Sequence, residues 1–272
     1  MIKLKSIGLA GMIMAAGVLA PGVMAQPDIT GTLQLYQGQY SYDVGGEFTA
    51  VSSPSLLGPY EGITGTPAVQ TANGSQGFQT FCVQTAVDFN PGNTYTYVAA
   101  SLTTVGSPQN NLPLTAGVAW LYGEFAQGKL NGYDFNTGND PTDAAARKAD
   151  AGLLQAAIWG LMGEAEYNDG AYTTPTTANN VFYKDALNYF GSLSAADASV
   201  TSSDYGLYDV GILNLSDSSG SAQNQLVWLG GGTGYDNQEP APDGGTTLAL
   251  LGLSLAGLAV FSRRLGGVQR VL

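Results

Sequence analysis

The chain contains no histidine, and this absence removes several kinds of active site. Serine triads with a histidine base, papain-like cysteine–histidine pairs and histidine-ligated zinc are all excluded. Carboxylate pairs survive as an acid–base option, but the aspartates and glutamates are so dispersed that no pair stands out. We therefore predict that the protein is not an enzyme, with no catalytic residue, no metal site and no cofactor.

Charge is also scarce, at 11% of the 272 residues, and basic residues are the scarcer kind. Two of the nine precede the first apolar run and three follow the last one, so four face 21 acidic residues in the part between. This excess of negative charge would repel phosphate backbones. We expect no nucleic-acid partner.

Long hydrophobic runs occur only at the two ends of the chain. At the N-terminus, Lys3 and Lys5 precede the apolar run Ile7–Leu19, and Val23-Met24-Ala25 has the small-x-small pattern of a cleavage site. Thirteen apolar residues are short for a hydrocarbon core of about 30 Å, which argues against the alternative of an uncleaved span. Residues 1–25 are thus predicted to be a signal peptide, and the protein to be exported.

The C-terminal run has three parts in order. The turn residues Pro242, Asp243, Gly244 and Gly245 come first, then an apolar stretch to Phe261, and last the basic pair Arg263 and Arg264. The arginines favour the cytoplasmic side, which would stop the segment in the membrane with the body outside. We expect a sorting or transmembrane segment at 242–265, after a linker at 231–241.

This arrangement resembles the PEP-CTERM class of bacterial sorting signals, in the variant where Pro-Asp-Ser-Gly or Pro-Asp-Gly-Gly replaces Pro-Glu-Pro. The resemblance implies that an exosortase-type membrane protease recognises the tail. It also implies an inner-membrane precursor that is later released to the cell surface or the extracellular matrix. An ordinary C-terminal membrane anchor is the alternative.

The body, residues 26–230, mixes strand and helix patterns. We predict an α+β fold: a β-rich sandwich or barrel-like domain with a helical subdomain inserted at about 114–193, plus hydrophobic helices at both chain ends. Alternating or β-rich runs predict strands at Gly31–Tyr42, Glu47–Val51, Gly77–Phe89, Tyr95–Leu102, Tyr208–Leu215 and Gln223–Leu229. Helical spacing of apolar residues predicts helices at Leu114–Gln127, 140–162 and Asn180–Leu193.

The only cysteine, Cys82, cannot form a disulfide within the chain, which is unusual for an exported protein. It follows Phe81 in a predicted strand, and 73 residues later a predicted helix carries Gln155-Ala156-Ala157-Ile158-Trp159. This pairing of an aromatic-Cys motif with Gln-x-Ala-x-Trp resembles the thioester domains of bacterial surface adhesins. The resemblance implies an internal thioester between Cys82 and Gln155.

The chemistry of such a cross-link is simple. The Cys82 sulfur would attack the Gln155 carboxamide carbon and expel ammonia. A surface amine could later displace the sulfur and become fixed to Gln155. Trp159, one helical turn beyond Gln155, and Phe81 are predicted to shield the bond from water.

Other interpretations remain open. Cysteine is among the most buried residues and often fills space in a core, and the Gln155 motif is also an ordinary amphipathic helix fragment. The body could instead bind extracellular polysaccharide non-covalently through aromatic side chains, or act as a carboxylate-dependent glycan hydrolase.

Overall fold

The computed structural model describes seven stretches of the chain: 29–63, 69–70, 74–100, 112–136, 141–164, 172–200 and 208–230. The predicted signal peptide and the linker lie outside these residues. So do the predicted terminal hydrophobic helices and the whole sorting segment, with Pro242, Asp243, Gly244, Gly245, Arg263 and Arg264. Within the seven stretches, every helix is too short or too polar to cross a membrane.

The strands form an antiparallel sheet in the order β3-β4-β2-β1-β5-β6-β7. Their bounds are β1 (Thr30–Tyr42), β2 (Gly45–Ser53), β3 (Val69–Gln70), β4 (Gln76–Thr80), β5 (Thr94–Ala100), β6 (Val210–Asp217) and β7 (Gly220–Trp228). Short turns join β1 to β2 and β6 to β7 as hairpins. In β5 buried and exposed residues alternate, because successive side chains of a strand point to opposite faces.

The two sides of this sheet meet just after β4. The Leu226 amide donates to the Phe81 carbonyl at 3.0 Å, and the Val83 amide donates to the Asn224 carbonyl at 3.1 Å. Between them Cys82 forms an isolated antiparallel bridge with Gln225 of β7. The sheet therefore curves until residues 81–83 join its far strand.

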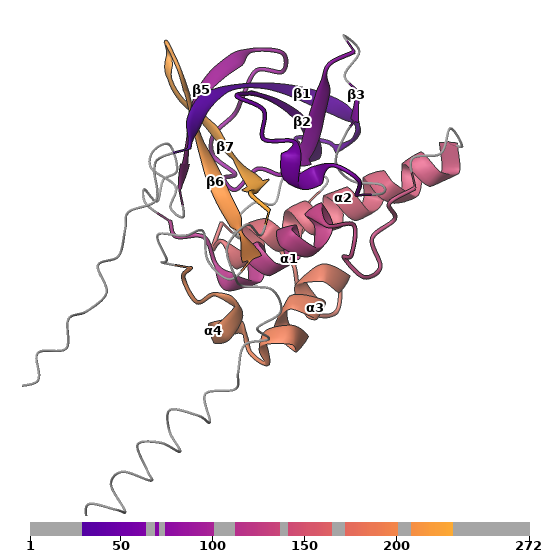
Figure 1. Cartoon of the computed structure of the whole chain (residues 1–272). Coiled ribbons are helices and arrows are strands. Elements are labelled where there is room, and N and C mark those ends of the chain that lie inside the picture. Colours follow the sequence, from indigo (N-terminus) through magenta and orange to yellow (C-terminus); the bar gives the residue numbers. More distant parts are fainter. Residues whose placement is uncertain are drawn as a thin grey trace, which may run out of the picture.

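In the described stretches, all of the α-helices lie between β5 and β6 in the chain and pack below the curved sheet, with α2 beneath β1 and β2 (Figure 1). They are α1 (Ala116–Ala126), α2 (Pro141–Leu161), α3 (Val181–Phe190) and α4 (Leu193–Ala196), and a 3-10 turn occupies Gly58–Tyr60. The Asn180 side chain caps α3 by accepting the Tyr183 amide at 3.0 Å. Gly191, with a φ of +75°, ends it in the left-handed conformation.

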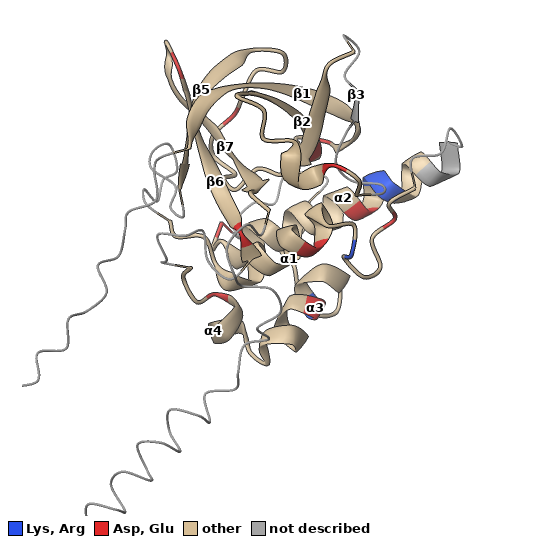
Figure 2. Ribbon diagram, viewed as in Figure 1, with Lys and Arg blue, Asp and Glu red and all other residues tan. Residues whose placement is uncertain are grey.

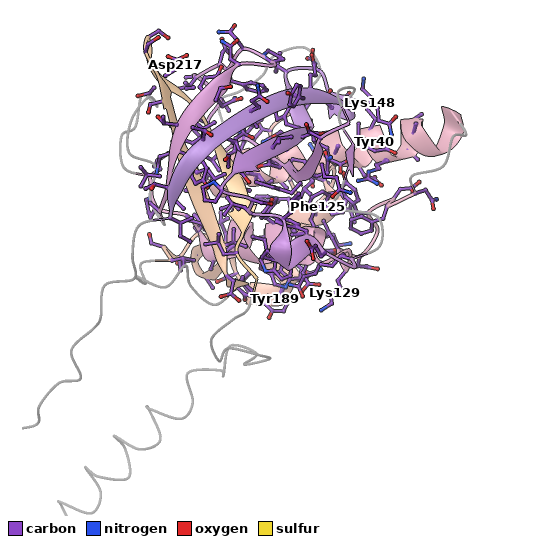
Figure 3. All side chains as sticks on the ribbon, turned by 45° about the horizontal axis from the view of Figure 1, so that its top comes forward. Tyr40, Phe125, Lys129, Lys148, Tyr189 and Asp217 are labelled. Carbon is purple, nitrogen blue, oxygen red and sulfur yellow. The ribbon has the colours of Figure 1, made fainter. Side chains whose placement is uncertain are left out.

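The largest apolar core lies between the sheet and the helices. Helix α1 is buried on most of its surface, and Phe125 lies inside the body while Lys129 and Lys148 lie at its periphery (Figure 3). The Phe125 ring packs edge-on against Phe81, with 5.0 Å between the ring centroids. Acidic residues are spread over sheet and helices alike, and basic ones are few (Figure 2).

The structure confirms the α+β class, with a β-rich core accompanied by helices. One strand prediction was wrong: the run Gly77–Phe89 ends its regular strand at Thr80, so Cys82 does not lie within β4. The alternating pattern continued past Thr80 because residues 81–83 are still extended and buried, although they pair with β7 only through a single bridge. An alternating sequence pattern indicates that the segment is extended and buried, but it does not show with which strand the segment pairs.

Candidate functional site

Two segments far apart in the chain meet at Cys82 and Gln155. Cys82 is held by the bridge to Gln225, and its side chain faces α2. Gln155 lies in the middle of α2, on the same face as Ala151 and Trp159, since residues four apart in a helix share a face. Both Cys82 and Gln155 are completely buried.

The carboxamide of Gln155 lies directly against Cys82. The Cys82 thiol donates to Gln155 Oε1 at 3.2 Å, and Gln155 Nε2 donates to the Cys82 carbonyl at 2.7 Å. Because the carboxamide carbon is one bond of about 1.2 Å from that oxygen, the sulfur is at most about 4.4 Å from it. The sulfur and the carbon that the sequence motif pairs are therefore neighbours.

Two backbone amides also point at the carboxamide oxygen. The Cys82 amide donates to Gln155 Oε1 at 3.2 Å, and the Gly46 amide donates to the same atom at 3.3 Å. Donors placed in this way stabilise negative charge on an oxygen when a nucleophile adds to its carbon. They also fix the orientation of the amide, because a flipped carboxamide would oppose N–H to N–H. The arrangement has the geometry of an oxyanion hole.

The glycine pair Gly45 and Gly46 at the start of β2 makes room for this contact. A Cβ on Gly45 would lie 2.8 Å from Gln155 Cγ and 2.7 Å from Tyr172 Oη. Gly46 has a φ of +89°, and a Cβ there would lie 2.6 Å from the Tyr42 nitrogen. No side chain fits at either position, so both glycines are needed for the strand to approach α2 this closely.

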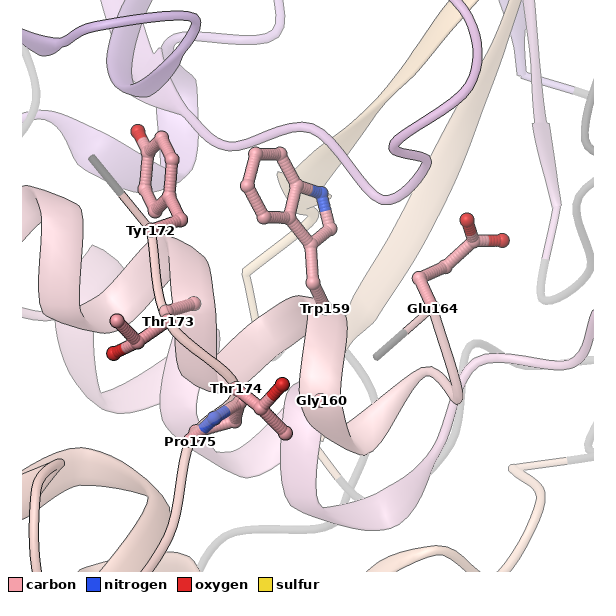
Figure 4. A pocket seen from close by; sticks show the side chains of 8 residues that line it. Trp159, Gly160, Glu164, Tyr172, Thr173, Thr174 and Pro175 are labelled. Atoms are coloured by element: carbon pink, nitrogen blue, oxygen red, sulfur yellow. The ribbon is translucent and has the colours of Figure 1, made fainter. Parts of the chain in front are cut away.

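Aromatic rings close the site. Trp159 is only 3% exposed and forms a small apolar cluster with Cys82, Tyr172, Phe48 and Ala156. The rings of Trp159 and Tyr172 meet edge to face, with 4.9 Å between centroids, and both rise from the helical layer toward the sheet (Figure 4). The Tyr172 hydroxyl donates to the Tyr42 carbonyl, which holds the ring in place.

Phe81 lies elsewhere. Its ring packs against Phe125 and Tyr122 of α1, within the main core. The reason is that neighbouring residues in extended chain point to opposite sides, so Phe81 faces α1 while Cys82 faces α2. Tyr172 and Phe48, rather than Phe81, are the rings that join Trp159 in the cluster with Cys82.

Burial is the main influence on the thiol. It raises the pKa of Cys82 well above that of an ordinary cysteine, because a thiolate would lose its hydration. Hydrogen bonding to its own amide and to Trp159 acts the other way, while the charges of Asp88 and Glu164 add to the rise. At neutral pH Cys82 is therefore a neutral thiol.

Glu164, just past the end of α2, ties the segment after Cys82 to this helix. Its Oε2 accepts hydrogen bonds from the Thr85 hydroxyl at 2.8 Å and the Thr85 amide at 3.2 Å. The space between Glu164, Trp159 and Tyr172 is about 10 Å³, room for a single water molecule at most. This side of the site therefore has little room for water.

A larger hollow of about 260 Å³ also borders Tyr172. Gly152 and Ala156 of α2 form its floor, with Tyr42, Tyr172 and Asn180 around it. Tyr172 lines this hollow and also packs in the cluster with Cys82, so its ring borders both.

Sequence reasoning singled out Cys82, Gln155 and Trp159, and these three lie together. It missed the Gly46 amide, Tyr172 and the two glycines. The Asp43-Val44-Gly45-Gly46 turn was the available signal for the glycines, since paired glycines mark a close backbone approach. Nothing in the local sequence around Tyr172 marks it out.

Comparison with known proteins bears on the tail. Residues 242–265 match the VPDSG-CTERM motif. The tail is a PEP-CTERM-type sorting signal. It marks the protein as exported, sorted to the cell surface.

The body has no such match. No curated protein and no solved structure is similar to the chain at a significant level. The resemblance to adhesin thioester domains receives no support from these comparisons.

Proposed function

We propose that the body is a covalent adhesion module, in which Cys82 and Gln155 form an internal thioester. The contact that supports this most is the buried Cys82 Sγ–Gln155 Oε1 approach of 3.2 Å, with two backbone amides on the same oxygen. A cysteine that only fills space does not need a carboxamide held in this way.

The cross-link forms in one addition and one elimination. The sulfur of Cys82 bonds to the carboxamide carbon of Gln155, the carbon–nitrogen bond breaks, and the thiol proton leaves with the amine as ammonia. The amides of Gly46 and Cys82 bind the oxygen while it carries negative charge. No oxidant, metal or cofactor takes part.

The closed site then preserves the bond. Thioesters react with water, so the Trp159 and Tyr172 rings, and the narrow space of about 10 Å³ beside them near Glu164, extend the lifetime of the bond. A primary amine on a surface partner, arriving at the Gln155 carbonyl, would displace Cys82 and remain joined through an amide. Each chain reacts once, so the module is an adhesin and not an enzyme.

Intact mass of the purified chain tests the cross-link. We expect a deficit of about 17 Da, the mass of ammonia, together with a thiol that stays unreactive after denaturation. Gln26 would begin the processed chain, and an N-terminal glutamine also loses ammonia when it cyclises. The Cys82→Ala and Gln155→Ala variants are the controls, because they remove the thioester deficit alone. A wild-type mass equal to that of Gln155→Ala, corrected for the substitution, rules out the cross-link.

For the tail we propose processing by an exosortase-type protease from an inner-membrane precursor. The support is the motif match at residues 242–265, which includes Arg263 and Arg264. Replacing Pro242 and Asp243 by alanine should keep the chain in the membrane fraction at its unprocessed C-terminal mass. Release of this variant at the wild-type rate would contradict the assignment.

A second function has one observation in its favour. The rings of Trp120 and Tyr189 stack with 4.5 Å between centroids, and Tyr189 is 40% exposed. An exposed ring face of this kind suits non-covalent binding of extracellular polysaccharide. Matrix binding that is lost in Tyr189→Ala but kept in Cys82→Ala would favour this function over the covalent one.

A further inference from the structure

A buried ion pair joins α2 to β2 next to the site. Arg147 Nη2 lies 2.6 Å from Glu47 Oε1, and Arg147 Nε lies 2.7 Å from Glu47 Oε2. Both side chains are completely buried. The Arg147 guanidinium also sits 4.1 Å from the centroid of the Tyr40 ring and donates to the Phe135 carbonyl at 3.2 Å.

The pair is connected to the site through both of its elements, β2 and α2. Glu47 directly follows Gly46, whose amide donates to Gln155. Arg147 precedes Gln155 by eight residues on α2, about 12 Å along the same face of the helix. The Arg147–Glu47 contact therefore sets how far α2 lies along β2 at the level of Gly46.

Stability alone does not account for this pair. Burial, the largest influence, raises the pKa of Glu47 in spite of Arg147, which means that the charged carboxylate is costly to bury. Burial would lower the pKa of Arg147, but its bonds to Glu47 outweigh this and raise it. The two hydrogen bonds from Arg147 to Glu47 are both shorter than 2.8 Å, as in an ionised pair. Apolar residues of similar size would stabilise such a position as well or better.

What the pair provides is geometry. Two parallel hydrogen bonds between a planar guanidinium and a carboxylate, here called the fork, fix both the distance and the rotation between α2 and β2. A single hydrogen bond from a lysine does not. The site needs this, because the Gly46 and Cys82 amides are already 3.3 and 3.2 Å from Gln155 Oε1. A shift of α2 by half an ångström would take these contacts beyond hydrogen-bonding distance.

We propose that Arg147 and Glu47 are positioning residues for thioester formation: their fork holds β2 and α2 in the register that places the Gly46 amide on Gln155 Oε1. This proposal rests on the thioester proposed above. Neither residue touches the reacting atoms, and both act through Gly46 and Gln155.

The test measures how fast the cross-link re-forms. The full-length chain in mild detergent is unfolded and treated with concentrated ammonia, which opens a thioester to the original thiol and carboxamide. Ammonia and denaturant are then removed, and the mass deficit is followed against time. Amide hydrogen exchange at Gly46 is measured in parallel, because it reports the Gly46–Gln155 contact whether or not the bond forms.

Three variants separate positioning from stability. Arg147→Lys keeps the charge but loses the fork. The double variant Glu47→Leu/Arg147→Met removes the charges and should keep the fold. Tyr60→Phe is the matched control: it removes a buried hydroxyl that accepts the Trp228 amide at 2.8 Å, outside both elements that the Arg147–Glu47 contact joins.

In both Arg147 variants we expect cross-linking to be roughly 10- to 100-fold slower, with faster exchange at Gly46. Tyr60→Phe should lower the melting temperature but leave both readings unchanged. A folded double variant that cross-links at the wild-type rate with a protected Gly46 amide overturns the proposal. A wild-type chain without any mass deficit overturns the thioester itself, and Gly46 exchange in the same samples still decides whether the fork sets the register.

Discussion

Phe81 and Cys82 are neighbours in the chain, yet they belong to two regions with different designs. Phe81 lies in the large core, where the surrounding side chains are mostly apolar rings in edge-to-face contact. Cys82 lies in a small cluster where a carboxamide, a thiol and backbone amides are all buried and hydrogen-bonded. The first region stabilises the fold through area removed from water. In the second region, buried polar groups fix the geometry of the site, although a stable fold does not require such groups.

The largest expected effect is on stability, and it comes from a substitution in the large core around Phe81. Phe81→Ala removes a completely buried ring that packs on Phe125, and should lower the free energy of unfolding by about 3–5 kcal/mol. Chemical denaturation measures this loss. The molecules that remain folded should still carry the mass deficit, because Phe81 does not face Gln155. A stably folded Phe81→Ala variant without the cross-link would show that the site at Cys82 depends on the core around Phe81.

Gly46→Ala should break the second region while sparing the first. Its backbone has a φ of +89°, and the new Cβ would meet the Tyr42 nitrogen, so the amide must move away from Gln155 Oε1. Loss of one such donor costs roughly 100-fold or more in rate, and we expect cross-linking to slow by that much. Gly220→Ala, at a φ of +132° in the β6–β7 turn, is the control for backbone strain alone. Equal rates in these two variants would deny Gly46 its role as a donor.

Most of the fold was predictable, because it follows from local patterns. Helix α1 was expected at Leu114–Gln127 and lies at Ala116–Ala126, and β1 was expected at Gly31–Tyr42 and lies at Thr30–Tyr42. Spacing of apolar residues and turn chemistry are enough for such elements. The end of β4 was missed, since burial continues past Thr80 through pairing with β7.

The site was half predictable for the same reason. Cys82, Gln155 and Trp159 lie in short motifs, so the sequence could pair them. The Gly46 amide becomes a donor only through the close approach of β2 to α2, and Tyr172 reaches the cluster from beyond the end of α2. Such placements depend on tertiary register, which no local pattern encodes.

The rate of cross-link formation should depend on pH, because the Cys82 thiol is buried. Because burial raises the pKa of Cys82, its thiolate fraction is small at neutral pH and grows about tenfold per pH unit. If the thiolate attacks, re-formation of the cross-link in the folded chain should accelerate continuously from pH 6 to 9, with no plateau near the ordinary thiol pKa of about 8.5. The time course of the mass deficit at each pH measures this. A rate independent of pH would mean that the thiol proton passes to the leaving nitrogen in the same step as attack.

The smallest expected effect concerns the ring of Tyr172, which borders both the larger hollow and the cluster with Cys82. Tyr172→Phe keeps the ring against Trp159 but removes the hydroxyl that donates to the Tyr42 carbonyl, at a cost of about 1 kcal/mol in unfolding free energy. With this tether gone the ring opens more often toward the hollow of about 260 Å³, so water should hydrolyse the cross-link a few-fold faster. The gain of about 18 Da on hydrolysis, from addition of one water, gives the rate by mass spectrometry. Tyr189→Phe, on the exposed Trp120 stack, is the control with the same atom removed far from Cys82. Identical hydrolysis in both variants would mean that Trp159 shields the bond and that the Tyr172 ring is part of the packing only.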